Sequence, residues 1–288
     1  MSKMPTLASN RSKTDSNPQS GDTSDSVVSP NDWSVLRQFT DARIALGSTG
    51  ISLPTHQMLA FQRDHALARD AVHTPLDAAS LAENLKSLSP TGEVTCLHSR
   101  ASTREEYLKR PDFGRRLSDE SLKKLKPLKG EFDLALTVVD GLSSLAVATQ
   151  AEPFLHALRA LLDEDAQSWN LAPLTICEQG RVAVGDEIAE KLGARMVLVL
   201  IGERPGLSSP DSMGLYLTHA PKVGLTDESR NCISNVRGAG LPPKIAAKKA
   251  FALMQEARRL SLSGVDLKDR SSGETDALTS TQTFLTKP

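Results

Sequence analysis

The segment with the clearest capacity for chemistry is residues 202–212 (GERPGLSSPDS), which follows the apolar run 196–201 (MVLVLI) with no residue between them. A short, branched apolar run bounded by Gly and Pro predicts a buried strand. The Gly and Pro residues after it favour a turn over a continued strand or a helix. This turn carries two carboxylates, Glu203 and Asp211, and the guanidinium of Arg204. The sequence therefore places hydrogen-bond acceptors and a donor directly after a buried strand.

Two further turns have the same character. Residues 140–144 (DGLSS) and 178–182 (EQGRV) each follow an apolar run and each contain a glycine. We expect Asp140 to be a further acceptor for a ligand and Arg181 a further donor. In a parallel sheet with right-handed crossovers, such turns emerge at one edge of the sheet. Glycine allows backbone N–H groups to approach a bound molecule closely. We expect a ligand rich in neutral hydrogen-bonding groups at this edge, although a purely structural role as turns remains the alternative.

No familiar catalytic or metal-binding pattern accompanies these turns. Cys232 lies in RNCISN, between the last expected strand and the closing helix, and the only histidine after residue 160 is His219. One such pair is weak support for a catalytic dyad. The chain also lacks the GxSxG, HExxH, P-loop and GxGxxG patterns. We therefore predict no catalytic residue and no metal site.

The segment RPDFGRR at residues 110–116 has two readings. Adjacent guanidiniums near the start of a helix suit a phosphate or a carboxylate, so Arg115 and Arg116 could cradle an anion. They could equally be tied to acidic neighbours at a subunit contact. The sequence leaves both readings open.

Charge and cysteine content exclude several classes of protein. The 34 basic and 35 acidic residues give a formal net charge of -1, so no overall field attracts nucleic acid or an anionic membrane. The three cysteines are odd in number and widely spaced, which is typical of reduced thiols in the cytosol. No apolar stretch approaches the length of a membrane span. We expect no nucleic-acid partner and no membrane association.

The elements that must position the turns fall into four parts. Residues 1–30 and 271–288 are polar and are expected to be disordered tails. Residues 31–130 read as a mainly helical N-terminal domain, and residues 131–270 as an α/β domain. We expect helices at 33–46, 54–72, 77–88, 146–162, 185–192 and 242–260, and strands at 94–97, 132–139, 174–177, 196–201 and 214–218. The fold class is thus α/β, a helical N-terminal part followed by a Rossmann-like, largely parallel sheet with flanking helices.

Six stretches, in order, resemble the light (small) chain of ethanolamine ammonia-lyase. They are RPDFGRRLS, DGLSS, GRVAVGDEI, LIGERPGLSSPDS, RNCISN and LSGV. The resemblance extends from about Ala42 to Val265 and excludes both tails. The pairing of GERPGLSSPDS with RNCISN is its most specific part.

The resemblance implies a carbon–nitrogen lyase that uses adenosylcobalamin to convert ethanolamine to acetaldehyde and ammonia by a radical mechanism. In this family the large catalytic subunit is a TIM barrel that holds the substrate, and the small chain helps to enclose the cobalamin. The resemblance therefore implies a non-autonomous subunit of a higher-order hetero-oligomer. It places the small-chain cobalamin contacts at Val182, Glu203 and Cys232. The expected location is the cytoplasm, with a bacterial microcompartment as the alternative.

Two other functions remain open beside this one. The chain could be a stand-alone module that binds a small ligand with the same turns at the carboxyl edge of its sheet. It could also be a purely structural partner of a larger subunit. A stand-alone module would bind its ligand without a partner subunit. A purely structural partner would show no change in cofactor affinity when the Glu203 carboxylate is removed.

Overall fold

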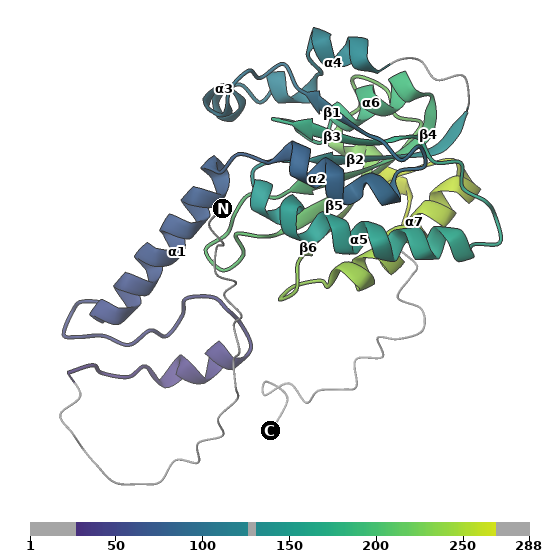
Figure 1. Ribbon diagram of the computed structural model, residues 1–288. Helices are drawn as coiled ribbons and strands as arrows, with labels where there is room; N and C mark the ends of the chain where they lie inside the picture. The colour runs from purple at the N-terminus through teal and green to yellow at the C-terminus, as the bar shows by residue number, and fades with distance from the viewer. Residues whose placement is uncertain (1–26, 126–130, 269–288) are drawn as a thin grey trace. The chain divides into compact units, whose positions relative to one another are not determined.

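The computed structural model describes residues 27–125 and 131–268 (Figure 1). The expected tails at 1–30 and 271–288 thus lie outside the described residues, apart from residues 27–30. By its internal contacts the chain divides into two compact units between Ala60 and Phe61.

The first unit contains little regular structure and little buried surface. Its helical turn, η1 (Asp32–Gln38), is a 3-10 helix, shorter than the helix expected at 33–46. Just beyond it, the Thr40 hydroxyl accepts a hydrogen bond from the Ala42 amide, a local bond that competes with helix formation. Among the described residues of this unit only Pro54 is buried.

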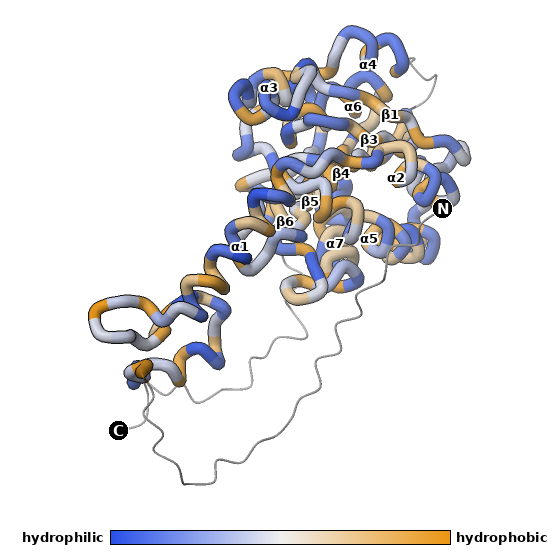
Figure 2. Tube along the Cα trace, turned by 60° about the vertical axis from the view of Figure 1, so that its left-hand side comes forward, coloured by the Kyte–Doolittle hydropathy of each residue, from blue (hydrophilic) through white to orange (hydrophobic). Residues whose placement is uncertain are grey.

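Helix α1 (Thr55–His73) begins in the first unit and continues into the second, close to the expected range 54–72. Hydrophilic and hydrophobic residues alternate along it (Figure 2). Of its residues only Ala71 is buried. None of the helices in the described part of the chain is long and apolar enough to cross a membrane.

The second unit is built on a six-stranded sheet in the order β1-β3-β2-β4-β5-β6. The strands are β1 (Val94–His98), β2 (Phe132–Val139), β3 (Leu174–Glu178), β4 (Ala194–Gly202), β5 (Met213–His219) and β6 (Arg230–Val236). The α/β class is confirmed. Strand β1 comes from the stretch expected to be mainly helical and pairs in parallel with β3.

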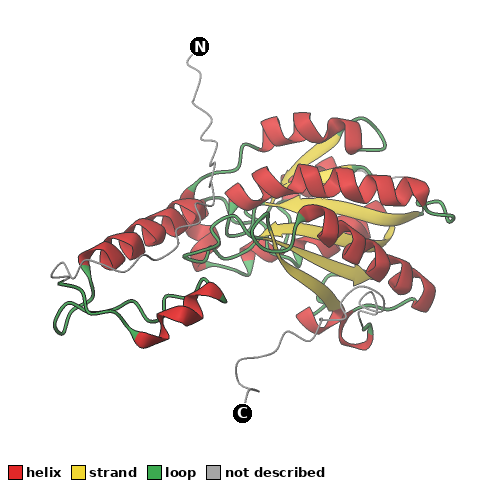
Figure 3. Cartoon of the chain, turned by 90° about the horizontal axis from the view of Figure 1, so that it is seen from below, coloured by secondary structure: helices red, strands yellow, loops and turns green. Residues whose placement is uncertain are grey.

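Helices cover both faces of this sheet (Figure 3). Helices α2 (Ala78–Leu85), α5 (Ser144–Glu164) and α7 (Pro243–Leu260) pack on one face, and α6 (Val184–Leu192) packs on the other, near α4 (Asp119–Lys124). Along β2, Leu134, Leu136 and Val138 join the first core while Ala135 and Val139 join the second. A strand with apolar residues on both faces must be covered on both, which explains the three-layer arrangement.

The expectation of a largely parallel sheet is only partly correct. Strands β1, β3, β2 and β4 are parallel, but β5 runs antiparallel to β4, and β6 antiparallel to β5. The connection between β4 and β5, residues 203–212, contains no helix. It is too short for a parallel crossover, which needs a dozen or more residues, so β5 pairs antiparallel with β4. A second correction concerns Cys232, which lies in strand β6 and not in a loop between strand and helix.

The helix boundaries follow their capping residues. The Ser143 hydroxyl accepts from the Ala146 amide at the start of α5, and Thr103 caps α3 (Arg104–Lys109) in the same way. Helix α6 ends at Gly193, which has a left-handed conformation with φ 74°. Helix α5 starts on one face directly after β2, while α6 starts on the other face after the neighbouring β3. Connections that leave in opposite directions open a crevice at the carboxyl ends of these strands.

Candidate functional site

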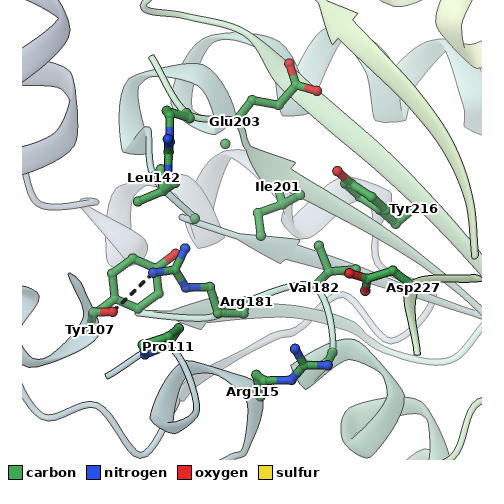
Figure 4. Close-up of a pocket in the computed structure, with 14 residues that line it drawn as sticks. Tyr107, Pro111, Arg115, Leu142, Arg181, Val182, Ile201, Glu203, Tyr216 and Asp227 are labelled. Atoms are coloured by element: carbon green, nitrogen blue, oxygen red, sulfur yellow. Dashed lines mark hydrogen bonds between the residues drawn. The ribbon is translucent and has the colours of Figure 1, made fainter. Parts of the chain in front are cut away.

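A cleft of about 520 Å³ lies at this edge of the sheet (Figure 4). Its walls include residues from all three turns singled out in the sequence, among them Leu142, Val182 and Glu203. Tyr216 of β5 and Asp227 extend the cleft over the antiparallel part of the sheet. The expected convergence of the three turns is therefore present in the structure.

Hydrogen bonds join the three turns to one another, and Asp140, just after β2, forms one of them. Its Oδ1 accepts a hydrogen bond from the Gly180 amide at 3.1 Å, which joins the second turn to the first. The amide of Leu142 donates to the carbonyl of Gly202 at 2.9 Å, which joins the first turn to the third. Arg104 of α3 donates to the Gly141 carbonyl at 2.8 Å and lies 3.6 Å from Asp140 Oδ2.

Asp140 itself lies beneath the cleft and is only 2% exposed. Burial raises its pKa to about 6, although the amides of Gln179 and Gly180 and the charge of Arg104 act in the opposite direction. Its role is therefore to hold the turns together and not to contact a ligand.

Two glycines allow the first and third turns to approach this closely. Gly141 has φ 58°, and a β-carbon there would lie 2.2 Å from the Gly202 carbonyl oxygen. A β-carbon on Gly202 would lie 2.0 Å from the carbonyl oxygen of Ser143. No side chain fits at either position without displacing backbone, so both glycines are required by the contact itself.

Glu203 is held in place by its neighbours. Its Oε2 accepts from the Ser212 hydroxyl at 2.5 Å and from the Asn235 amide at 3.2 Å. Its Oε1 has no hydrogen-bond donor within the described part of the chain. Gly214 leaves room for that oxygen, since a β-carbon there would lie 2.9 Å from Oε1. One carboxylate oxygen is thus fixed while the other can accept a hydrogen bond from a ligand.

The rest of the 203–212 turn is anchored at both ends. Ser143 Oγ donates to the Pro210 carbonyl at 2.7 Å in addition to capping α5. Arg237, just after β6, donates to the Ser208 carbonyl at 3.0 Å and lies 3.8 Å from an Asp211 oxygen. Asp211, an expected acceptor for ligand, is therefore engaged with Arg237.

Tyr107 forms one side of the cleft between two arginines. The guanidinium carbons of Arg181 and Arg104 lie 4.1 Å and 4.7 Å from the centre of its ring. Its hydroxyl donates to the Gly180 carbonyl at 3.1 Å. Arg181 donates to the Tyr107 main-chain carbonyl at 3.2 Å, the bond drawn in Figure 4. Burial raises the pKa of Tyr107, so its hydroxyl stays protonated at neutral pH.

Of the expected cobalamin contacts, Val182 and Glu203 line the cleft, whereas Cys232 lies just outside its lining. Cys232 is exposed and is the cross-strand partner of Tyr216, which does line the cleft. Desolvation raises the pKa of the Cys232 thiol, so the thiol is neutral at neutral pH and a weak nucleophile.

Sequence reasoning missed the two tyrosines. The chain contains only two, and both Tyr107 and Tyr216 line the cleft. This scarcity was an available signal, because tyrosine combines a large apolar ring with one hydrogen-bonding group and is common in binding sites. Asp227 was missed as well, since it lies far from the three turns in the sequence.

The two arginines of residues 110–116 have different surroundings, and both readings of this segment remain predictions. Arg116 forms two hydrogen bonds with the nearly buried carboxylate of Glu187, at 2.8 and 3.2 Å. Arg115 lines the cleft. The arginine pair therefore consists of one structural residue and one residue available to a ligand.

The chain matches a known family over most of its length. The family model for ethanolamine ammonia-lyase light chain (EutC) matches residues 30–268. A protein of Pseudomonas syringae pv. tomato named ethanolamine ammonia-lyase small subunit is 53% identical over 251 residues, which is 86% of each chain. A protein of the same name from Azotobacter vinelandii is 54% identical over 250 residues, which cover 85% of this chain and 91% of the relative. On these matches the chain belongs to the ethanolamine ammonia-lyase light chain family.

Proposed function

We propose that this chain is the small subunit of a cytoplasmic, adenosylcobalamin-dependent ethanolamine ammonia-lyase and completes its cobalamin site. The substrate, ethanolamine, binds the TIM-barrel large subunit, with which this chain forms a higher-order hetero-oligomer. The supporting observation is the cleft in which Val182 and Glu203 lie together, with Cys232 paired to one of the lining residues.

The residues of the cleft suit the chemistry of cobalamin. The rim of the corrin ring carries neutral amide side chains, which need hydrogen-bond acceptors and donors. Glu203 Oε1 is an acceptor without a donor among the described residues, and the turn at Val182 contributes backbone groups. A cleft of about 520 Å³ is small for a whole cobalamin. We therefore assign it to one part of the cofactor, with the large subunit enclosing the rest.

In this proposal the reactive chemistry comes from the cofactor, which supplies radical chemistry when bound. Glu203 accepts a hydrogen bond from a peripheral amide and so fixes the orientation of the corrin. Ser212 and Asn235 hold the Glu203 carboxylate in place. Val182 and Tyr216 provide apolar surface that excludes water from this side. Cys232 contacts the cofactor as a neutral group and carries no redox role.

The decisive experiment is a titration of the complex with its large subunit, using cyanocobalamin followed in the visible spectrum. We expect Glu203→Gln to weaken binding by about 1–3 kcal/mol, because Ser212 and Asn235 would hold the amide oxygen and leave its NH2 group at the position of the free acceptor. Glu228→Gln is the matched control, because Glu228 is an exposed carboxylate outside the cleft lining. Equal affinities of the wild type and Glu203→Gln would contradict the assignment of Glu203.

A further inference from the structure

The cleft lining contains three arginines, Arg115, Arg181 and Arg204, and two carboxylates, Glu203 and Asp227. Neither Arg115 nor Arg181 forms an ion pair with a carboxylate anywhere in residues 27–125 or 131–268. Neighbouring arginines behave differently, since Arg110 is paired with Asp112 at 2.7 Å and Arg116 with Glu187 at 2.8 Å. Unpaired guanidiniums that share a concave site favour an anionic ligand.

Arg181 is held in position for such a ligand. It stacks on the Tyr107 ring and donates one hydrogen bond to the Tyr107 carbonyl at 3.2 Å. Its Nε is buried and has no acceptor within the described residues. Folding has already removed part of the water around this guanidinium, so anion binding does not require that desolvation again. An anion that accepts a hydrogen bond from Nε should therefore bind favourably.

The charged side chains are distributed along the cleft, with Arg204 next to Glu203 in the chain. In Figure 4, Glu203 lies at one end and Arg115 at the other, with Ile201 and Val182 between them. Asp227, the other carboxylate of the lining, is 3.5 Å from the Nε of Arg230, which engages its charge. An elongated ligand with hydrogen-bond donors at one end and a negative charge at the other would match this distribution.

We propose that Arg115 and Arg181 form an anion subsite for a phosphodiester. This inference rests on the proposed function, because the phosphodiester of the nucleotide loop is the one negatively charged group on the periphery of cobalamin. In this arrangement Glu203 receives an amide of the corrin rim, and the two arginines receive the phosphate. The cleft then selects complete cobalamin over corrinoids that lack the phosphate.

The test is equilibrium dialysis of the complex with its large subunit against three corrinoids with the same cyanide ligand. Cyanocobalamin has both phosphate and base, cyanocobinamide phosphate has the phosphate without the base, and cyanocobinamide has neither. The variants are Arg115→Gln, which removes an exposed side chain, and Arg181→Met, which retains packing on Tyr107. Arg110→Gln is the control, since Arg110 is exposed, paired with Asp112 and outside the cleft lining.

We expect Arg115→Gln and Arg181→Met each to weaken cyanocobalamin and cyanocobinamide phosphate about tenfold, as for loss of a charge-assisted hydrogen bond. Cyanocobinamide should bind each variant within about twofold of the wild type, and Arg110→Gln should leave all three affinities unchanged. Arg181→Lys, which keeps the charge, should recover part of the loss.

Two results would overturn the inference: equal weakening of all three corrinoids, or unchanged binding of cyanocobalamin to both variants. In either case the wild-type complex would still bind cobalamin, and the proposed function would stand. If the wild-type complex binds none of the three corrinoids, the proposed function fails, and the subsite assignment fails with it.

Discussion

At the scale of single residues, Asp140 shows how much the cleft depends on a group that no ligand touches. Its carboxyl joins the turns after β2 and β3, and it is buried beside Arg104. Desolvation raises its pKa from the ordinary 3.8 to about 6. The folded protein therefore binds this proton more tightly than the unfolded chain does. The position of the turns is maintained at some cost in stability when Asp140 is ionised.

This leads to a prediction for the pH dependence of stability. The raised pKa gives a stabilising contribution that is complete below pH 3.8 and is lost as the pH rises through about 6. Asp140→Asn removes the titration but keeps an oxygen that can accept from Gly180. The difference in unfolding free energy between wild type and variant should change by up to about 3 kcal/mol between pH 4 and 7. Urea unfolding of both proteins at pH 4 and pH 7 measures this change. The same difference in unfolding free energy at the two pH values would contradict a raised pKa for Asp140.

At the scale of elements, the important contact is the one between the turn after β2 and the end of β4. The Leu142 amide donates to Gly202 there, and the absence of a side chain at Gly141 and Gly202 permits the approach. The same turn carries Ser143, which caps α5 and also holds Pro210. A change at this contact should therefore affect both the start of α5 and the loop that carries Glu203.

We predict that Gly202→Ala lowers the unfolding free energy by more than about 2 kcal/mol, because the new methyl group would meet backbone that cannot move aside. Gly238→Ala is the matched control. Gly238 is exposed and a β-carbon there would have no atom within 4 Å, so its effect should stay within about 0.5 kcal/mol. Thermal and urea unfolding of the two variants provide the comparison. Similar losses of unfolding free energy in both would show that the close approach of the two turns at Gly202 does not matter for stability.

The elements also show what sequence could and could not predict. The strand 132–139 and the end of α6 at Gly193 were predicted closely, because buried apolar runs and a left-handed glycine leave strong local signals. Strand β6 was missed because it is an edge strand whose exposed residues, such as Cys232 and Ser234, are not strongly apolar. Its direction was not predictable from local pattern, since strand pairing depends on residues far away in the chain.

The cleft was predictable to the extent that it depends on the turns. Val182 and Glu203 come from turns whose Gly content and position after strands were visible in the sequence. Tyr107 and Arg115 reach the cleft only through the packing of the segment 104–116 against the Gly180 turn. Such tertiary placement leaves no periodic signal, so these residues could be suspected from their chemistry but not located.

At the scale of the whole molecule, the main concave feature at the carboxyl edge of the sheet is the cleft, for which we propose a binding role. The cleft lining combines Tyr, Arg, Glu and Asp side chains with apolar ones, and the cysteine beside it carries a neutral thiol. This composition fits a subunit that positions a cofactor while a partner performs the reaction.

We therefore predict that the isolated chain has no ethanolamine ammonia-lyase activity and binds cyanocobalamin at least about tenfold more weakly than the complex does, because part of the enclosing surface is missing. Activity assays and dialysis with the chain alone, the large subunit alone and the mixture provide the measurement. Binding by the isolated chain as tight as by the mixture would instead support a stand-alone ligand-binding module.

The hydrogen bonds that join the three turns also bear on the kinetics of recognition. Because the amides of Gly180 and Leu142 are hydrogen-bonded to neighbouring turns, we expect this side of the cleft to form during folding, without a ligand. Their amides should accordingly exchange slowly with deuterium even without ligand. A preformed surface loses little conformational freedom on encounter, so substitutions along the cleft should shorten the residence time of the cofactor and leave its rate of arrival nearly constant.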